Sequence, residues 1–441
     1  MKKLFKAISL ILAVSVFMSA CSVVDKITGT DTAKKDDTAS KIVFQDTPID
    51  RENFESQTED PGVDKTDIFE AEKPLTHSQV VTALDFVIER IDANLMDFTK
   101  KYPSANTTDY VYEATENKGW TEGFWTGMLW MAYQYTEDPK YKSAAAAQCE
   151  DFRARLENNV ALEHHDIGFL YYLSCVKGYE ITGIDSMKET ALLAADKLLE
   201  RYNEKGKYIQ AWGEYGKEDE QRLIIDSMMN LELLYWAYTE TEDEKYYNAA
   251  YEHAKTTAMV ITRPDASTYH TSYINPETGN PSHGVTAQGV SDDSAWARGQ
   301  AWGIYGFLKS HIYTGDELFM QEGKKIANYF LNNLPEDNVC YWDLSYTEGD
   351  EPRDTSAAAI AASALLTCAK QYDDQYSDTY TFAAHSIIKS LMNNYTTADI
   401  EGSNSVLAHG VYSKPGNLGV DESLIWGDYY YMEALMKLHG I

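Results

Sequence analysis

The sequence has few basic residues for the number of acidic ones. Its 38 Lys and Arg stand against 69 Asp and Glu, which gives a formal net charge of −31 over 441 residues. Nucleic-acid binding needs clustered Lys and Arg to neutralise phosphates, so this balance argues against a nucleic-acid partner. The five cysteines form no CxxC pair, His and carboxylates lack metal-ligand spacing, and no phosphate-binding glycine loop is present. We therefore expect no metal and no other cofactor.

The first twenty residues, MKKLFKAISLILAVSVFMSA, combine a basic start with an apolar run too short to span a membrane comfortably. This pattern predicts a signal peptide over residues 1–20. The following segment, MSAC, resembles a bacterial lipobox, in which the cysteine is acylated and becomes the mature N-terminus. We therefore expect lipidation of Cys21 and a membrane anchor outside the cytoplasm, with ordinary secretion as the alternative.

Residues 21–75 are polar, charged and poor in periodic apolar positions, which predicts a flexible tether. A capping pair, Thr76-x-x-Gln79, then precedes apolar residues at helical spacing and marks the start of the folded domain. The domain is expected to extend over residues 76–441. Little of it shows the period-two alternation of strands.

A loose internal repeat of helix pairs runs through this domain. Each copy begins with a polar or aromatic residue, continues as a mostly apolar helix, ends in a T-x-D-like turn and is followed by an amphipathic helix. The first residue precedes the turn threonine by sixteen positions in copies starting at Trp120, Asp166 and Arg298, and by fifteen in the copy starting at Asp226. About six such pairs predict a closed double ring, an all-α (α/α)6 barrel with apolar helices inside.

In such a ring the inner helices run parallel, so the residues at their starts gather at one mouth. Asp166, Asp226, Arg298, Asp354 and Asp428 hold these positions, and we expect them to converge on one cleft. Two acids there would suit general acid–base catalysis. The alternative is that Asp166 and Asp226 only cap their helices, although the equivalent position elsewhere holds arginine or tryptophan, which a cap would not accept.

The run RLIIDSMMNLELLYWAY, residues 222–238, predicts an inner helix that carries Asp226 among apolar neighbours. Desolvation disfavours a carboxylate anion, so we expect the pKa of Asp226 to be raised. A carboxyl group in that state could donate a proton near neutral pH.

The segment SDDSAWARGQAW alternates polar side chains with indoles. Arg298 could bind a carboxylate through two parallel hydrogen bonds, and Trp296 and Trp302 could stack on a sugar ring. The alternatives are core packing for both tryptophans and an internal ion pair from Arg298 to Asp292 or Asp293.

Several segments together resemble the unsaturated glucuronyl hydrolases, family 88 of the glycoside hydrolases. They are GWTEGFWTG, HHDIGF, IIDSMMNLELLYWA, QGVSDDSAWARGQAWGIYGF, RDTSAAAIAASALL and WGDYYYMEAL, and the resemblance runs from about Pro74 to the C-terminus. It implies an (α/α)6 barrel and an unusual reaction. Enzymes of this family hydrate the C4=C5 double bond of the unsaturated uronic acid that polysaccharide lyases leave at a non-reducing end.

Carried over by position, the resemblance makes Asp226 the general acid/base and Asp166 the second acid, which would hold sugar hydroxyl groups and tune Asp226. It also implies a set of positions that bind the unsaturated sugar or wall the site: His270, Gln288, Arg298, Trp120, Trp212, Trp296 and Trp302. From the residues alone, His270 could instead be a structural histidine, which is the commoner role for a lone histidine.

The sequence departs from the family pattern at two places. Ala287 precedes Gln288 where relatives often have histidine. Near the C-terminus Ser413 fits the substrate-binding pattern of sulfate-tolerant relatives, whereas Gly416 and Leu418 do not. The preferred polysaccharide, its linkage and its sulfation therefore stay open, as does the choice between monomer and dimer.

Two alternatives remain beside the leading hypothesis. One is an unsaturated rhamnogalacturonyl hydrolase of family 105, which shares the fold and chemistry but acts on pectin fragments. The other is a surface lipoprotein that binds saccharides without turnover. That protein would retain the tryptophans and Arg298 but would not need both acids.

Overall fold

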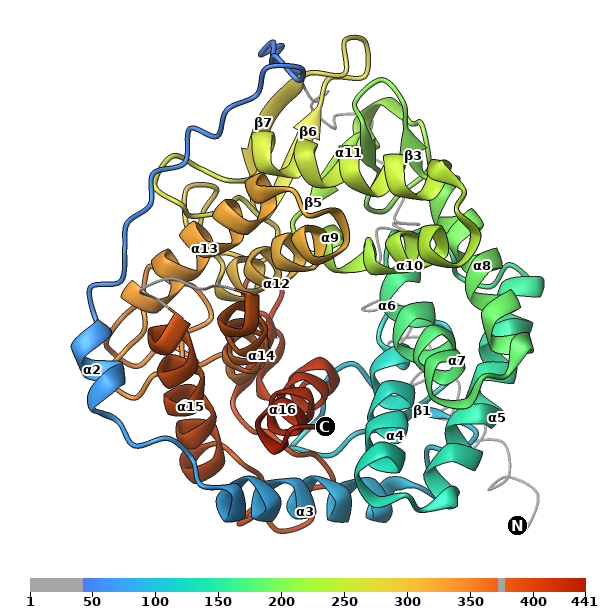
Figure 1. The fold of residues 1–441 in the computed structure, drawn as a ribbon, viewed down its shortest axis with the longest axis vertical. Helices are drawn as coiled ribbons and strands as arrows, with labels where there is room; N and C mark the ends of the chain where they lie inside the picture. The colour runs from blue at the N-terminus through green and yellow to red at the C-terminus, as the bar shows by residue number, and fades with distance from the viewer. Residues whose placement is uncertain (1–42, 372–376) are drawn as a thin grey trace, which may run out of the picture.

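A computed structural model describes residues 43–371 and 377–441, and its helices form a double ring (Figure 1). The outer helices are α3 (His77–Asn94), α5 (Pro139–Glu157), α8 (Asp185–Leu199), α11 (Glu244–Val260), α13 (Glu317–Asn332) and α15 (Ser377–Asn394). The inner segments are α4 (Glu122–Thr136), α6 (Ile167–Tyr171) with α7 (Lys177–Thr182), α9 (Ser227–Asn230) with α10 (Glu232–Thr241), α12 (Ala297–Thr314), α14 (Thr355–Gln371) and α16 (Ile425–His439).

The ring closes as the repeat predicts. Each inner segment packs on the next one, and α16 returns to pack on α4. The helix α3, at the start of the domain, packs against the last inner helix, α16, and so takes the place of its outer partner. The predicted (α/α)6 barrel is confirmed, including the capping box at Thr76 and Gln79 that begins α3.

The T-x-D motif is the turn from an inner to an outer helix. At the end of α4, Thr136 donates its hydroxyl to the carbonyl of Ala132 and accepts from the backbone N–H of Asp138. Asp138 then accepts from the N–H of Lys140 and so caps α5. Thr241 with Asp243, and Thr314 with Asp316, repeat this arrangement.

Two inner segments differ from the continuous helices that the sequence predicts. Between α6 and α7, residues Tyr172–Val176 form a π-helical turn. In the run 222–238, residues Arg222–Ile224 are not helical but form strand β5, and the inner helix starts only at Ser227. β5 pairs antiparallel with the strand that follows His270, and this pairing outweighs the helical pattern of the run.

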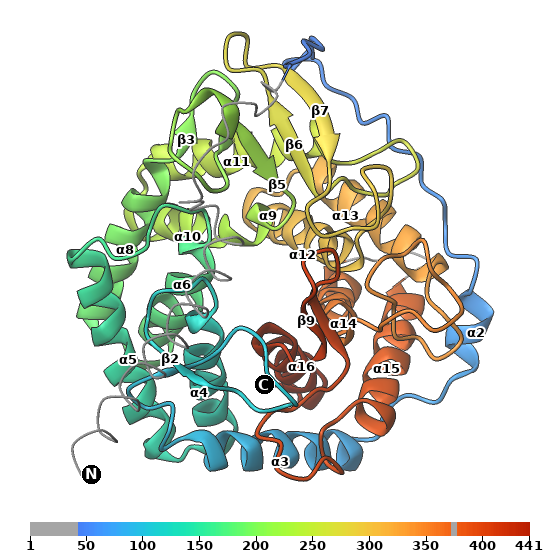
Figure 2. The same cartoon turned by 180° about the vertical axis from the view of Figure 1, so that it is seen from behind.

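Short paired strands lie in the segments that connect the helices of the ring. The three-stranded sheet holds β5 (Arg222–Ile224), β6 (Thr271–Ile274) and β7 (Pro281–Val285), and the other strands pair as β1 (Tyr102–Pro103) with β2 (Ala114–Thr115), β3 (Tyr202–Asn203) with β4 (Tyr208–Ile209), and β8 (Gly410–Ser413) with β9 (Leu418–Glu422). β5 leads into the inner segment α9 and β9 into α16, so these strands border the mouth at which the inner helices start (Figure 2).

Residues 43–75 run along the outside of the ring (Figure 1), with the short helix α2 (Thr66–Ala71) near their end. The backbone N–H of Thr47 donates to the Pro281 carbonyl at 3.2 Å, and Arg51 donates to the Gly279 carbonyl at 3.0 Å. From residue 43 on, the segment that we expected to be a flexible tether is therefore a strap, and it holds the β6–β7 hairpin from outside.

The predicted signal peptide and Cys21 lie outside the described residues. Within residues 43–371 and 377–441, no helix is both long and apolar enough to cross a membrane.

Candidate active site

Asp166 and Asp226 stand at the starts of neighbouring inner segments, just before α6 and α9. The two segments approach closely at Gly168, where a Cβ atom would lie 2.3 Å from the Cα atom of Asn230. Glycine is therefore required here. Asn230 joins both acids, because its Nδ2 donates to Asp166 Oδ1 at 3.5 Å and to the backbone carbonyl of Asp226 at 3.4 Å.

Helix capping does not account for these two aspartates. In the described part of the chain, neither makes a side-chain capping hydrogen bond to its helix. Asp226 Oδ1 is buried and finds no hydrogen-bond partner among the described residues. A buried carboxyl oxygen without a partner is costly for stability, which is typical of a group kept for binding or chemistry.

The two carboxyl groups have pKa values displaced in opposite directions. Burial, and then the nearby charge of Asp166, raises the pKa of Asp226 well above its usual value. Burial would also raise the pKa of Asp166, but His165, His164 and Asn230 outweigh it and lower that pKa. The raised pKa predicted for Asp226 is confirmed. These opposite displacements favour the state in which a proton shared by the pair lies on Asp226.

Two histidines adjoin this pair. His164 accepts from the Asp166 backbone N–H at Nδ1 (3.1 Å), and its Nε2 lies 3.0 Å from the Ala161 carbonyl. Its Nδ1 also lies 3.4 Å from Asp166 Oδ2. His165 is buried, and its Nε2 lies 3.4 Å from Asp166 Oδ1 and 3.9 Å from Asp226 Oδ1.

Arg298, the second residue of α12, is buried with its donors occupied. Nη1 donates to Asp354 Oδ2 at 2.8 Å and to the Val411 carbonyl at 2.5 Å, and Nη2 donates to Gln288 Oε1 at 2.8 Å and to the Tyr412 carbonyl at 2.6 Å. The internal ion pair considered for Arg298 is therefore made with Asp354, not with Asp292 or Asp293.

His270 and Gln288 lie beside Arg298 at the two ends of the β6–β7 hairpin. Because Gln288 Oε1 accepts from Arg298, its Nε2 faces His270 Nε2 at 3.5 Å and donates to it. His270 Nδ1 then donates to Thr271 Oγ1 at 2.6 Å. Burial lowers the pKa of His270 to about 3, so it is neutral and its tautomer is fixed by Arg298 through Gln288.

Three of the predicted tryptophans lie against polar site residues. Trp120 Nε1 donates to Tyr412 Oη at 2.8 Å, and the Arg222 guanidinium lies 4.6 Å from the ring centre of Trp212. Trp296 contacts both His270 and Arg298, whose ring and guanidinium centres are 4.9 Å and 4.4 Å from the Trp296 ring.

Trp302 and Ser413 have mainly internal contacts. Trp302 is 1% exposed and packs on Phe169 and Tyr430, which places it beneath the acids in the barrel interior. Ser413, at the end of β8, accepts from the N–H of Gly416 at 3.2 Å.

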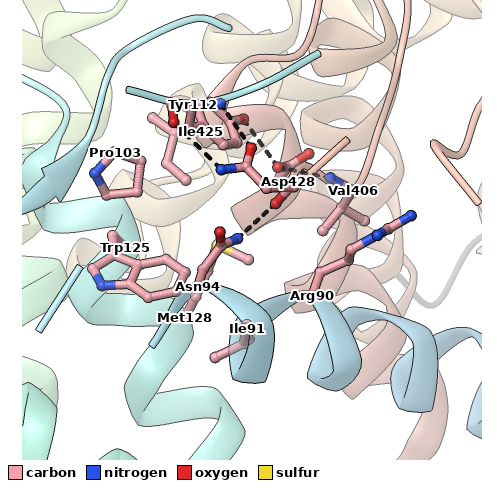
Figure 3. A pocket seen from close by; sticks show the side chains of 11 residues that line it. Arg90, Ile91, Asn94, Pro103, Tyr112, Trp125, Met128, Val406, Ile425 and Asp428 are labelled. Carbon is pink, nitrogen blue, oxygen red and sulfur yellow. Dashed lines mark hydrogen bonds between the residues drawn. The ribbon is translucent and has the colours of Figure 1, made fainter. Parts of the chain in front are cut away.

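We expected Asp354 and Asp428 to converge on one cleft with Asp166 and Asp226, but both lie apart from that pair. Asp354 is fully buried, caps α14 by accepting from the N–H groups of Ser356 and Ala357, and balances the charge of Arg298. Asp428 lies within α16 and faces another pocket (Figure 3), where it accepts from the N–H groups of Val406 and Leu407 and from the Tyr112 hydroxyl. Burial raises the pKa of Asp428 to about 7.

Among the described residues, no group of three or more His, Cys, Asp or Glu side chains could hold a metal ion. The chemistry that the site offers rests on a protonated carboxyl, an ionised carboxyl and hydrogen-bond donors.

The sequence profile described as Glycosyl Hydrolase Family 88 matches residues 90–440. The chain belongs to glycosyl hydrolase family 88. It is 46% identical to an unsaturated chondroitin disaccharide hydrolase of Streptococcus pneumoniae over 83% of this chain and 93% of that protein. It is also 40% identical to an unsaturated glucuronyl hydrolase of Bacillus sp. strain GL1, over 78% of this chain and 93% of that protein.

Solved structures of family 88 enzymes share the fold. The crystal structure of an unsaturated glucuronyl hydrolase from Streptococcus agalactiae superposes with a TM-score of 0.85 at 44% identity, covering 87% of this chain and 97% of that one. The corresponding enzyme from Bacillus sp. GL1 gives a TM-score of 0.79 at 38% identity, covering 82% and 97%. The family 88 assignment makes the chain a glycoside hydrolase, as predicted.

The sequence reasoning missed four residues of this family 88 site. His164 and His165 adjoin Asp166 in the segment HHDIGF, and Asn230 follows Asp226 by one helical turn. Their adjacency to the acids was the available signal. Tyr412, which contacts Trp120 and Arg298, had no signal beyond its place next to Ser413.

Proposed function

We propose that this family 88 chain removes the 4,5-unsaturated uronic acid from the non-reducing end of lyase-generated, glycosaminoglycan-type oligosaccharides. The observation that carries the proposal is the acid pair. The carboxyl groups of Asp166 and Asp226 both lie within 4 Å of His165 Nε2, and the pKa of Asp226 is raised while that of Asp166 is lowered. The reaction needs a carboxylic acid that still holds its proton near neutral pH, and the raised pKa of Asp226 supports that role.

In the proposed reaction, Asp226 gives its proton to C4 of the C4=C5 double bond. Positive charge then develops at C5 and is shared with the ring oxygen, as in other oxocarbenium-like states. A water molecule adds to C5 while the Asp226 carboxylate takes one of its protons, which restores the acid. The C5–O5 bond of the hemiketal then breaks, giving a keto acid and a hemiacetal at C1 that releases the shortened saccharide.

The other site residues take supporting roles in this proposal. The ionised Asp166 accepts from sugar hydroxyl groups and lies close enough to stabilise the positive charge that develops during protonation. Gln288 and His270 lie next to each other in the site, and the buried guanidinium of Arg298 orients the Gln288 amide. Trp120, Trp212 and Trp296 supply ring faces for sugar stacking, with Trp302 beneath them and Ser413 at the rim.

The relatives' names guide the substrate class. Three streptococcal relatives at 44–46% identity are named unsaturated chondroitin disaccharide hydrolases, and a related structure contains a disaccharide of unsaturated glucuronic acid and 6-sulfated N-acetylgalactosamine. We accordingly place the substrate among glycosaminoglycan disaccharides. The family 105 activity on pectin fragments is the competing outcome.

The test uses the ultraviolet absorbance of the conjugated double bond in lyase products. The purified chain should remove that absorbance from chondroitin or hyaluronan disaccharides faster than from pectin fragments. Unchanged absorbance with disaccharides from chondroitin, hyaluronan, heparin and pectin alike would overturn the catalytic proposal. Turnover of the pectin fragments alone would instead favour the family 105 activity.

We also propose that the enzyme is anchored outside the cytoplasm through a lipid on Cys21. The support is the sequence MSAC after a basic and apolar leader. Incorporation of a labelled fatty acid into the wild-type chain, and its loss in Cys21→Ala, is the expected result. Release of unlabelled wild-type chain into the medium would indicate ordinary secretion.

A further inference from the structure

His165 is held between the two acids by its backbone. Its N–H donates to the Ala211 carbonyl at 2.8 Å, and the preceding His164 pairs with Trp212 in an isolated bridge. The side chain is 1% exposed, so solvent does not satisfy its ring nitrogens. Within the described residues, neither Nδ1 nor Nε2 has a hydrogen-bond partner. A buried imidazole left in this state requires an explanation.

Within residues 43–371 and 377–441, the carboxylates that lie within 4 Å of a His165 ring nitrogen are those of the acid pair. Nε2 lies 3.4 Å from Asp166 Oδ1 and 3.9 Å from Asp226 Oδ1. Burial lowers the pKa of His165 to about 4, so the ring is neutral near pH 7 and carries one N–H. Hydrogen on Nε2 points toward the Asp166 anion, whereas the other tautomer would turn a lone pair toward that anion. The geometry therefore favours the Nε2–H tautomer.

We propose that His165 is a positioning residue that decides which acid holds the shared proton, by donating Nε2–H to Asp166. The donation favours the anion of Asp166 and leaves the proton on Asp226, where the reaction needs it. After Asp226 has given its proton away, the same N–H lies 3.9 Å from the new carboxylate and favours its negative charge electrostatically. This inference rests on the proposed function, because it assumes that Asp226 is the proton donor.

Several other groups face this cluster and share its electrostatics. They are His164 on the same loop, Arg201 after α8, His253 on α11, His270 before β6, Arg298 on α12 and Tyr412 on β8. His253 is committed elsewhere, since its Nδ1 accepts from the Ile209 N–H and its Nε2 contacts Ser227 Oγ at 2.7 Å. Arg298 is bound to Asp354 and Gln288, so neither group replaces the Nε2–H of His165.

The test compares the pH dependence of kcat/KM in His165→Leu, His165→Met and His165→Gln with that of the wild type. Leu and Met remove the donor, while the Gln amide places an N–H near the position of Nε2. A hydrogen bond to a charged group favours the anion by an amount equivalent to roughly one pH unit. The pKa that defines the acidic limb of the kcat/KM profile should therefore rise by about one unit in the Leu and Met variants. This rise lowers kcat/KM about tenfold on the acidic side of the profile. In the Gln variant the pKa should return to its wild-type value.

The outcomes separate the inference from the proposed function. If the wild type consumes no unsaturated disaccharide, the proposed function fails and the inference fails with it. If the wild type is active and the acidic limb stays in place in Leu and Met, only the role of His165 is overturned. Failure of both apolar variants to fold, with Gln folded, would make His165 a structural group and would also overturn the inference.

Discussion

Replacing Asp226 by Asn should abolish turnover and yet stabilise the protein at neutral pH. The substitution keeps the shape of the side chain and removes the transferable proton. A positioned general acid/base contributes about 10² to 10⁴ in rate, so we expect kcat to fall by about that factor. Asp226 makes no capping bond, and its Oδ1 lacks a partner among the described residues, so little native structure should be lost.

The gain in stability can be sized from the geometry. Asp166 Oδ1 and Asp226 Oδ1 lie 3.4 Å and 3.9 Å from the same nitrogen, so they are no more than about 7.3 Å apart. Two negative charges at that separation repel by about 2 kcal/mol at an effective dielectric constant near 20. The wild type avoids this repulsion by keeping a proton on Asp226, which the unfolded chain would release near pH 4.

A folded pKa above the unfolded value means that stability is greatest at low pH and is lost as pH rises toward the folded pKa. Asp226→Asn should therefore be more stable than wild type by at least about 2 kcal/mol at pH 7, because burial of the Asp226 carboxylate adds to the repulsion, and the difference should vanish below about pH 4. Thermal unfolding across this pH range measures the effect. Calorimetric titration with a disaccharide should show affinity within roughly tenfold of wild type, about 1.4 kcal/mol.

Asp166→Asn is the matched control with the opposite sign. Its folded pKa is lowered, so the anion contributes stability above the unfolded value near pH 4, and this contribution is lost as pH falls through the folded pKa. The Asn variant should accordingly be less stable than wild type at pH 7. If Asp226→Asn instead lost stability and binding together, Asp226 would be a structural cap and the catalytic reasoning would be refuted.

Three further substitutions test the fold around the site. Gly168→Ala should cost more than about 2 kcal/mol of unfolding free energy, because its Cβ would meet backbone at 2.3 Å, whereas Gly323→Ala, with 3.4 Å to its nearest neighbour, should be neutral or stabilising by thermal denaturation. Arg51→Ala should raise KM and lower stability by about 1 kcal/mol, since it frees the strap from the β6–β7 hairpin; an unchanged KM would contradict that link. Asp428→Asn should destabilise by about 1–3 kcal/mol without changing the pH profile of kcat/KM, because an amide replaces one acceptor oxygen by a donor.

The barrel could be predicted because its determinants are local and repeated. The turn at Thr136 and Asp138 uses side-chain hydrogen bonds to backbone groups at most four residues away, so the same letters recur wherever the turn recurs. The inner helices are recognisable because they are buried on most sides and therefore mostly apolar, as α14 is. The raised pKa of Asp226 followed from the same apolar surroundings.

The strands could not be predicted because their pairing is long-range. β5 spans only Arg222–Ile224, too short for an alternating pattern, and its partner β6 lies beyond a complete outer helix. The ordered strap could not be predicted for a similar reason: residues 43–64 are mostly polar, and they are held by contacts with distant segments, such as Gln45 with Ser282 of β7 and Asp60 with Asn328 of α13. Adjacency to Asp166 does not reveal the role of His165, because the sequence does not show whether the ring nitrogens of a histidine have hydrogen-bond partners.

The repeated position at the start of each inner helix carries similar residues with different partners, and the partners separate chemistry from structure. The Asp354 oxygens accept hydrogen bonds from Arg298 and from the first turn of α14. The Asp428 oxygens accept from Val406, Leu407 and Tyr112. Asp226 has no comparable set, because its Oδ1 has no hydrogen-bond partner in the described chain. Leaving such a buried group unsatisfied costs about 1–3 kcal/mol. That this oxygen lies at the mouth, beside the second acid and 3.9 Å from His165 Nε2, is the strongest physical argument that substrate completes this site.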